Sequence, residues 1–254
     1  MMNAVANTLM MFNGVGGMQA VLAEEKEVDF FIHELLPYNF FGNTVYITTT
    51  HVCELIIIIG ILIFAVAARI AVMRAKEVPT GFQNVIELLV ETLEKYVFSS
   101  MGKHGKKFYV NYIGTILLLI FLCNISGLIG LRPPTADYGT TLCLAIISVA
   151  MIQYNNFKFN KFGAIKALFE PVFIFFPINL IGEVATVVSL SLRLYGNIMA
   201  GTVMITLYYT MIPIFAKIGI PAALHAYLDV FSGAIQAYVF TMLTMVFITN
   251  KIEG

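Results

Sequence analysis

The side chain most able to do chemistry in this sequence is a lone arginine within a long apolar stretch. Arg193 follows Glu183 by ten residues and precedes Lys217 by 24, so no other charge is close to it along the chain. A charged side chain at the centre of a bilayer costs about 2.5 to 3.5 kcal/mol, which makes such an arginine a candidate for function. Because a guanidinium stays protonated under all relevant conditions, the sequence predicts a fixed positive charge rather than a proton carrier.

The neighbours of Arg193 at helical spacing are small or polar. Ser189 and Asn197 lie four positions before and after it, and therefore on the same face of a helix. The small residues nearby are Gly196, Ala200 and Gly201. Such a face lets another helix approach closely. The simpler alternative is a structural arginine that pairs with Glu183 or Asp229.

A second polar group lies in the last apolar segment. Its members are His225, Asp229, Ser232 or Gly233, and Gln236. They recur at spacings of three, four and seven, so they share one helix face. Taken alone, His225 is an interfacial residue and Asp229 a salt-bridge partner, but together they predict a polar path through the membrane.

Composition explains why these polar groups are unusual. The chain is 59% hydrophobic and 12% charged, with a mean hydropathy of +0.86, which is typical of a membrane protein. The formal net charge is zero and no basic patch is interleaved with aromatics, so nucleic acid is not an expected partner. Cys53, Cys123 and Cys143 lack metal-like spacing, and we expect neither a metal nor a cofactor.

Uncharged stretches of about 20 residues locate the membrane spans. We predict an all-α integral membrane protein with five transmembrane helices and one amphipathic helix on the membrane surface. The expected single membrane domain, 1–254, contains an outer-side amino-terminal segment (1–47), a first span (48–74), a surface helix (81–104) and membrane helices at 108–131, 138–157, 168–212 and 217–250. In the surface helix, apolar residues such as Val85, Leu88 and Leu89 recur at helical spacing beside Glu87 and Glu91.

The distribution of basic residues predicts the orientation. With the amino terminus outside, the inner side receives Arg69, Arg74, Lys76, Lys95, Lys103, Lys106, Lys107, Lys158, Lys161, Lys166 and Lys251. The outer side receives Lys26, Arg132 and Lys217. This imbalance favours a cytoplasmic carboxy terminus.

The segment that contains Arg193 is too long for a simple span. From Pro171 to Tyr208 a continuous helix would be roughly 57 Å long, nearly twice the hydrocarbon thickness. It must tilt, kink near Pro177, or break. A break at Gly196 would make two spans of one and move the carboxy terminus outside.

Several motifs resemble, in order, those of one known family. They are "HELLPYNF" from residue 33, "RPPTADYGTTLCLAI" (132–146), "PINLIGEV" (177–184), "SLSLRLYGN" (189–197) and "IQAYVFTMLTMVFI" (235–248). The chain resembles subunit a of the F-type ATP synthases, the stator of the membrane motor. The resemblance implies that Arg193 faces the ion-binding carboxylate of a ring of c subunits, that Asn197 and Gln236 help to hold it, and that the last two membrane helices are steeply inclined.

The same resemblance implies two offset half-channels for the coupling ion. In the predicted topology Glu183, with Asn179 and Ser189, lies on the inner side of Arg193. Asp229, with His225 beyond it, marks the outer path, and Thr202 also lies on the outer side. The implied partners are the c-ring, the b subunits of the peripheral stalk, the remaining ATP synthase subunits and the lipid bilayer. No GxxxxGK[ST] loop occurs, so ATP chemistry is expected in partner subunits.

Two departures from the family pattern affect the coupling ion. Relatives often carry a glutamate where this chain has Thr202, and some carry a histidine where it has Asp229. A proton path needs titratable groups, whereas sodium can use hydroxyl and carboxylate oxygens. We expect protons, with sodium as the alternative.

Other classes of membrane protein fit less well. A secondary transporter is expected to show internal repeats, which are not evident here. A haem-bearing subunit needs histidines within its spans, and only His225 qualifies. An intramembrane protease needs a nucleophile with a base, or paired acids. A purely structural membrane subunit has no need for Arg193.

Overall fold

The computed structural model describes residues 34–40, 43–73, 81–129, 132–161, 163, 176–211 and 220–253. The chain separates into two units, 1–33 and 34–254, and every described residue belongs to the second. The first unit, and with it most of the expected amino-terminal segment, lies outside the described residues.

A small antiparallel hairpin precedes the first span. Strand β1, Glu34–Phe40, pairs with β2, Asn43–Thr48, so that Tyr38 lies opposite Val45. Pro37 in β1 is compatible with this sheet because a two-stranded sheet consists only of edge strands. This hairpin was not predicted from the sequence. Strand β2 runs without a linker into the first helix at Thr49.

Within the described part of the chain, five helical runs are long and apolar enough to cross a membrane. They are α2, Thr49–Met73; α4, Lys107–Ile125, extended by the 3₁₀ turn η2, Ser126–Ile129; α5, Tyr138–Asn160; α7, Phe176–Met211; and a last run made of α8, Ile220–His225, the π-helical η6, Ala226–Phe231, and α9, Ser232–Glu253. The predicted fold class, an all-α membrane protein, is therefore confirmed, with the hairpin as an addition.

The expected surface helix is α3, Phe82–Met101, followed by the 3₁₀ turn η1, Gly102–His104. One face buries Ile86, Val97 and Met101, while much of the rest is exposed. Lys95 Nζ lies 2.7 Å from Glu91 Oε1, and this ammonium lowers the pKa of the Glu91 carboxyl. Gly102 has a φ of +51°, which ends the helix in a conformation that favours glycine.

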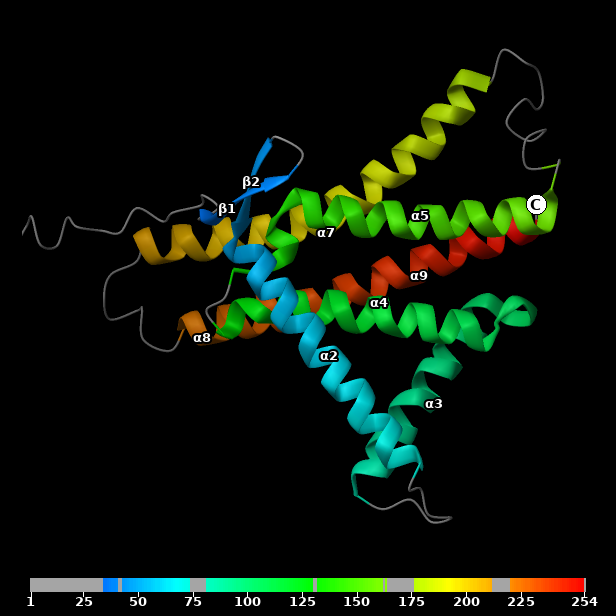
Figure 1. Ribbon diagram of the computed structural model, residues 1–254, viewed down its shortest axis with the longest axis horizontal. Coiled ribbons are helices and arrows are strands. Elements are labelled where there is room, and N and C mark those ends of the chain that lie inside the picture. The colour runs from blue at the N-terminus through cyan, green and yellow to red at the C-terminus, as the bar shows by residue number, and fades with distance from the viewer. Residues whose placement is uncertain are drawn as a thin grey trace, which may run out of the picture. The chain divides into compact units, whose positions relative to one another are not determined.

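The core lies among α4, α5, α7 and α9 (Figure 1). Helix α9 contacts each of the other three, and α5 also contacts α7. Its fully buried members include Ile113 and Ile120 of α4, Leu194 of α7 and Phe240 of α9. By contrast, most apolar side chains of α2 are exposed. This pattern suits a protein whose outer solvent is lipid, because apolar surface costs little there.

Helix α7 is continuous through the site. It contains 36 residues, which corresponds to about 54 Å of helix. The alternative of a break at Gly196 is therefore wrong. Pro177 lies in the first turn, where proline is tolerated because its nitrogen needs no intrahelical partner. The expected residues 168–175 lie outside the described part of the chain.

Candidate functional site

Arg193 lies on an open face of α7. Leu190, Leu194 and Ile198 turn their side chains into the protein, with exposed fractions of 1%, 0% and 6%. Arg193 is exposed on another face. The small exposed residues on either side of it are Gly182, Ala185, Ser189, Gly196 and Ala200. A Cβ built at Gly182 or Gly196 meets nothing within 4 Å, so this face has room for a closely packed partner.

No acidic side chain neutralises Arg193 among the described residues. The two acids expected for a structural pair have other partners: Glu183 Oε1 is 2.5 Å from Lys251 Nζ, and Asp229 Oδ2 is 2.7 Å from His225 Nδ1. The alternative of a structural arginine paired with Glu183 or Asp229 therefore does not hold. On the open face of α7 the guanidinium therefore carries a charge that no described side chain compensates.

A pocket of about 230 Å³ adjoins the guanidinium. Its lining comes from α7 and from the far half of α9: Gly182, Ala185, Thr186, Ser189, Leu190, Arg193, Leu243 and Phe247. The pocket therefore continues from Arg193 toward the amino-terminal half of α7, where Glu183 also lies. Ser189 lines this side of the pocket.

The polar face of the last helical run meets α7 just beyond Arg193. The Ser232 hydroxyl donates to Asn197 Oδ1 over 2.9 Å, which joins α7 to the start of α9. Gln236, one turn further along α9, is only 8% exposed, and its Nε2 has no hydrogen-bond partner among the described residues. None of the hydrogen bonds found between described residues joins Arg193 to Asn197 or Gln236, so the implied holding of the arginine by these amides stays a prediction.

Asp229 and His225 form a partly exposed pair on this helical run. Asp229 lies within the π-helical turn η6, and such turns often occur at functional sites. Its Oδ2 lies 3.7 Å from the position that a Cβ at Gly127 would take, so the carboxylate also approaches the turn after α4. The hydroxyl of Thr202, by contrast, donates to the carbonyl of Ile198 over 2.9 Å within α7.

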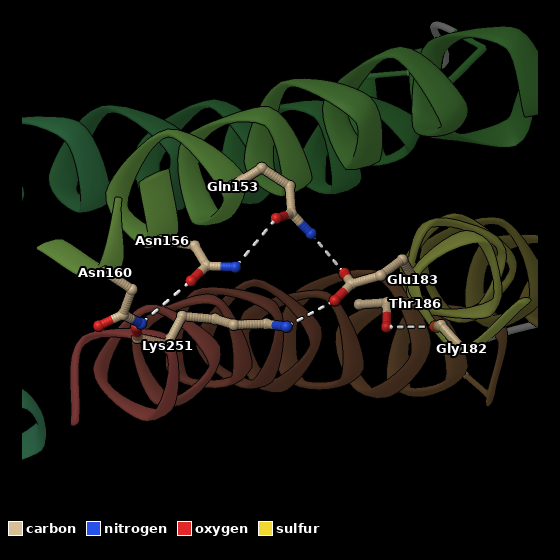
Figure 2. A network of polar contacts seen from close by, with 7 residues as sticks. All are labelled: Gln153, Asn156, Asn160, Gly182, Glu183, Thr186 and Lys251. Atoms are coloured by element: carbon tan, nitrogen blue, oxygen red, sulfur yellow. Dashed lines mark hydrogen bonds and ion pairs between the residues drawn. The ribbon is translucent and has the colours of Figure 1, made fainter. Parts of the chain in front are cut away.

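Glu183 is held from two other helices (Figure 2). Lys251 of α9 forms the ion pair with Oε1, and the amide nitrogen of Gln153 in α5 donates to Oε2. Asn179, half-buried, lies one turn earlier on α7. Glu183 and Asn179 were predicted from the sequence, but Gln153 and the pairing role of Lys251 were not. The run "QYNNFKFN" carried a signal, because Gln153, Asn156 and Asn160 recur at helical spacing.

The described residues contain no group of three or more His, Cys, Asp or Glu side chains that could hold a metal ion. The chemistry available at this site is therefore that of one guanidinium, two separated acids with their partners, and several amides and hydroxyls.

Comparison with known proteins agrees with the membrane architecture. The family model described as ATP synthase A chain matches residues 52–249. The "ATP synthase subunit a, sodium ion specific" of Propionigenium modestum is 38% identical over 192 residues, which cover 69% of this chain and 65% of that protein. The "ATP synthase subunit a" of Listeria welshimeri is 37% identical over 84% of this chain and 92% of its own length, and that of Priestia megaterium is 34% identical over 87% and 98%.

The residues that the family model matches include parts of all five long apolar helices found among the described residues, and the arginine on α7. The chain thus belongs to the ATP synthase A chain family, the membrane subunit a of ATP synthases.

Proposed function

We propose that this chain is the ion-translocating stator of a rotary ATP synthase, in which Arg193 faces the ion-binding carboxylate of a c-ring. The observation that carries the proposal is the position of Arg193, exposed on a face of small residues while Glu183 and Asp229 pair elsewhere. A charge facing lipid would be costly, whereas a charge facing an acidic partner is compensated. The open Gly196 leaves room for the partner's helix.

The proposed role follows from elementary electrostatics. A carboxylic acid surrounded by lipid keeps its proton because desolvation disfavours the charged form. When it arrives beside the guanidinium of Arg193, the positive charge favours the carboxylate, and the bound ion leaves. The same fixed charge opposes the direct passage of a cation between the two access paths. Net ion flow then requires rotation of the ring.

The two access paths are proposed on opposite sides of Arg193. Glu183, Asn179 and Ser189 belong to the inner path, and the pocket beside Arg193 supports this because Ser189 lines it. Asp229, His225 and Thr202 belong to the outer path, and the contact between His225 and Asp229 supports a polar route there. Asn197 and Gln236 lie between the two paths.

Protons are the proposed coupling ion, because the imidazole of His225 contacts the carboxylate of Asp229 and these are residue types that commonly relay protons. Sodium is the second candidate. It is favoured by the similarity to a relative whose name specifies sodium and by the hydroxyl of Thr202 in place of a carboxylate.

The chain is a non-catalytic membrane subunit, and its partners are other ATP synthase subunits. We propose that these include the c-ring and the b subunits, and that the protein lies in the cell inner membrane with its amino terminus outside. Contacts between helix ends support this orientation: Lys106 lies over the Phe159 ring and His104 lies 3.4 Å from Glu253, which brings several basic segments to one end.

The test is Arg193→Ala in the purified complex, reconstituted in proteoliposomes. We expect ATP-driven ion uptake to be lost while the subunits still co-purify. The matched control is Arg69→Ala, the same substitution on the exposed surface of α2, which should pump normally. Unchanged pumping by Arg193→Ala would reject the proposal.

A further inference from the structure

The carboxylate of Glu183 has both oxygens occupied. Lys251 Nζ is 2.5 Å from Oε1, and Gln153 donates to Oε2 (Figure 2). One of these partners is a neutral amide and the other is a monovalent cation on a flexible stem. The position on Oε1 is therefore a cation position that the chain fills with its own side chain.

Other hydrogen bonds hold the backbone of residue 251 and the carboxylate of Glu183 in place without help from the Lys251 ammonium. Asn160 Nδ2 donates to the backbone carbonyl of Lys251 over 2.8 Å and to Asn156 Oδ1 over 3.1 Å. Asn156 Nδ2 in turn donates to Gln153 Oε1 over 3.5 Å, and Gln153 reaches Glu183. These contacts tie the backbone of residue 251 to α5 and tie α5 to Glu183. The ammonium can thus leave Oε1 while the backbone around it stays in place.

The pair is also accessible. The side chains of Lys251 and Glu183 are 37% and 26% exposed. Partly exposed ion pairs are weak because water competes for both partners. A mobile cation that reaches Oε1 can therefore exchange with the ammonium.

We propose that Lys251 is a tethered cation that competes with the coupling ion for Glu183 and so sets the cation concentration at which the inner access path fills. This inference rests on the proposed function, because it requires Glu183 to lie on that path. It assigns to Lys251 a part in ion selection in addition to its contacts with α5 and α7.

A purely structural clamp makes a different prediction. A clamp would change the assembly or stability of the complex and leave its response to cations untouched. Competition changes the half-saturating cation concentration and leaves the maximal rate similar. The two interpretations are separated by a cation titration rather than by a single activity value.

The test uses the reconstituted complex with its ATP-hydrolysing part facing the bath, so that bath ions enter by the inner path. Initial rates of ATP-driven uptake are measured against bath pH and, separately, against bath sodium at fixed pH. For Lys251→Gln we expect a half-saturating concentration of the coupling cation about twofold to fivefold lower than in the wild type. Lys251→Arg, which keeps the charge, should resemble the wild type.

The matched control is Lys95→Gln, which removes the same charge from another lysine–glutamate pair, that with Glu91 on α3. It should leave the half-saturating concentration unchanged. Equal values for Lys251→Gln and the wild type would overturn the inference. If Arg193→Ala still pumps, the proposed function itself fails. If Arg193→Ala loses pumping but Lys251→Gln leaves the half-saturating cation concentration unchanged, only the inference about Lys251 fails.

A second measurement covers the case in which Lys251→Gln does not assemble. A water-soluble carbodiimide joins a carboxylate to a contacting amine as an amide, which would fix Lys251 on Glu183. We expect brief treatment to inactivate wild-type uptake faster than that of Lys251→Arg, whose guanidinium does not form this bond. The Arg variant also reports the loss caused by reaction at other carboxylates. Equal inactivation rates, with the Glu183–Lys251 cross-link detected by mass spectrometry, would overturn the inference.

Discussion

The hydroxyl of Ser232 donates a hydrogen bond of 2.9 Å to Asn197 Oδ1, and this bond joins the helix of Arg193 to the start of the returning helix. Asn197 lies one turn beyond Arg193, and Gln236 lies one turn beyond Ser232. The bond therefore fixes the register between the two helices where the proposed access paths come closest to each other.

Ser232→Ala should loosen this register. Interhelical hydrogen bonds in membranes contribute about 0.6 kcal/mol on average, so we expect a small loss of stability and a reduced ratio of ATP made to ions passed. The measurement is ATP synthesis driven by an imposed ion gradient. Ser99→Ala is the control, because the hydrogen bond that the Ser99 hydroxyl makes among the described residues stays within its own helix, to the Tyr96 carbonyl.

Gly196→Leu should leave folding of the subunit intact while it impairs association with the c-ring or ion uptake. A Cβ at this position meets nothing within 4 Å, so the subunit should fold and insert. The larger side chain would occupy the face proposed for the c-ring, and we expect ring association or ion uptake to be lost. Gly60→Leu on α2, where a Cβ also meets nothing within 4 Å, should be tolerated. Normal uptake by Gly196→Leu would argue against ring contact at this face.

Gly233→Ala should instead damage the fold. The added Cβ would lie 2.9 Å from Asn124 Cβ, and Asn124 Nδ2 donates to the Gly233 carbonyl at 3.1 Å. Overpacking of this kind costs about 1 to 3 kcal/mol. We expect a lower melting temperature of the purified complex, measured by thermal unfolding. Gly60→Ala on α2, where a Cβ meets nothing within 4 Å, should leave the melting temperature unchanged.

Asp229→Asn tests the outer path and the coupling ion together. If Asp229 passes protons, its loss should slow ATP-driven uptake by roughly a hundredfold, as for other positioned proton-transfer groups. Asp137→Asn is the control, since asparagine preserves the cap that Asp137 gives to the Gly139 nitrogen. For proton coupling, ATP hydrolysis titrated with sodium at fixed pH should show no stimulation; stimulation by sodium would select the alternative ion.

The membrane spans could be predicted from the sequence because the bilayer imposes a length and a composition on them. Apolar runs such as that of α2 satisfy both conditions without any knowledge of their neighbours. The continuity of α7 through Gly196 was left open, because a continuous helix of this length is nearly twice as long as the hydrocarbon layer is thick. Within a bilayer no water competes for the backbone, which favours an unbroken helix.

Other features depend on contacts that no local pattern encodes. The hairpin before α2 requires pairing between strands that contain Pro37 and border Gly42, both of which suggest a loop when they are considered alone. The ion pair of Glu183 with Lys251 spans 68 residues, and it forms only because α7 and α9 pack together. From the sequence, Lys251 contributed only to the topology. The polar face of the last helical run could be predicted from the sequence, because its residues lie only three or four positions apart along the chain.

The unbroken course of α7 has a mechanical consequence for the proposed motor. A helix without a joint resists bending, so a sideways force on the guanidinium of Arg193 is carried along the rod instead of being absorbed by local rotation of the backbone. Leu190 and Leu194, which seat this rod against its neighbours, would then bear the reaction torque of the turning ring. In the proposed motor, these hydrophobic contacts behind Arg193 would keep its guanidinium at a fixed depth in the membrane while the ring turns.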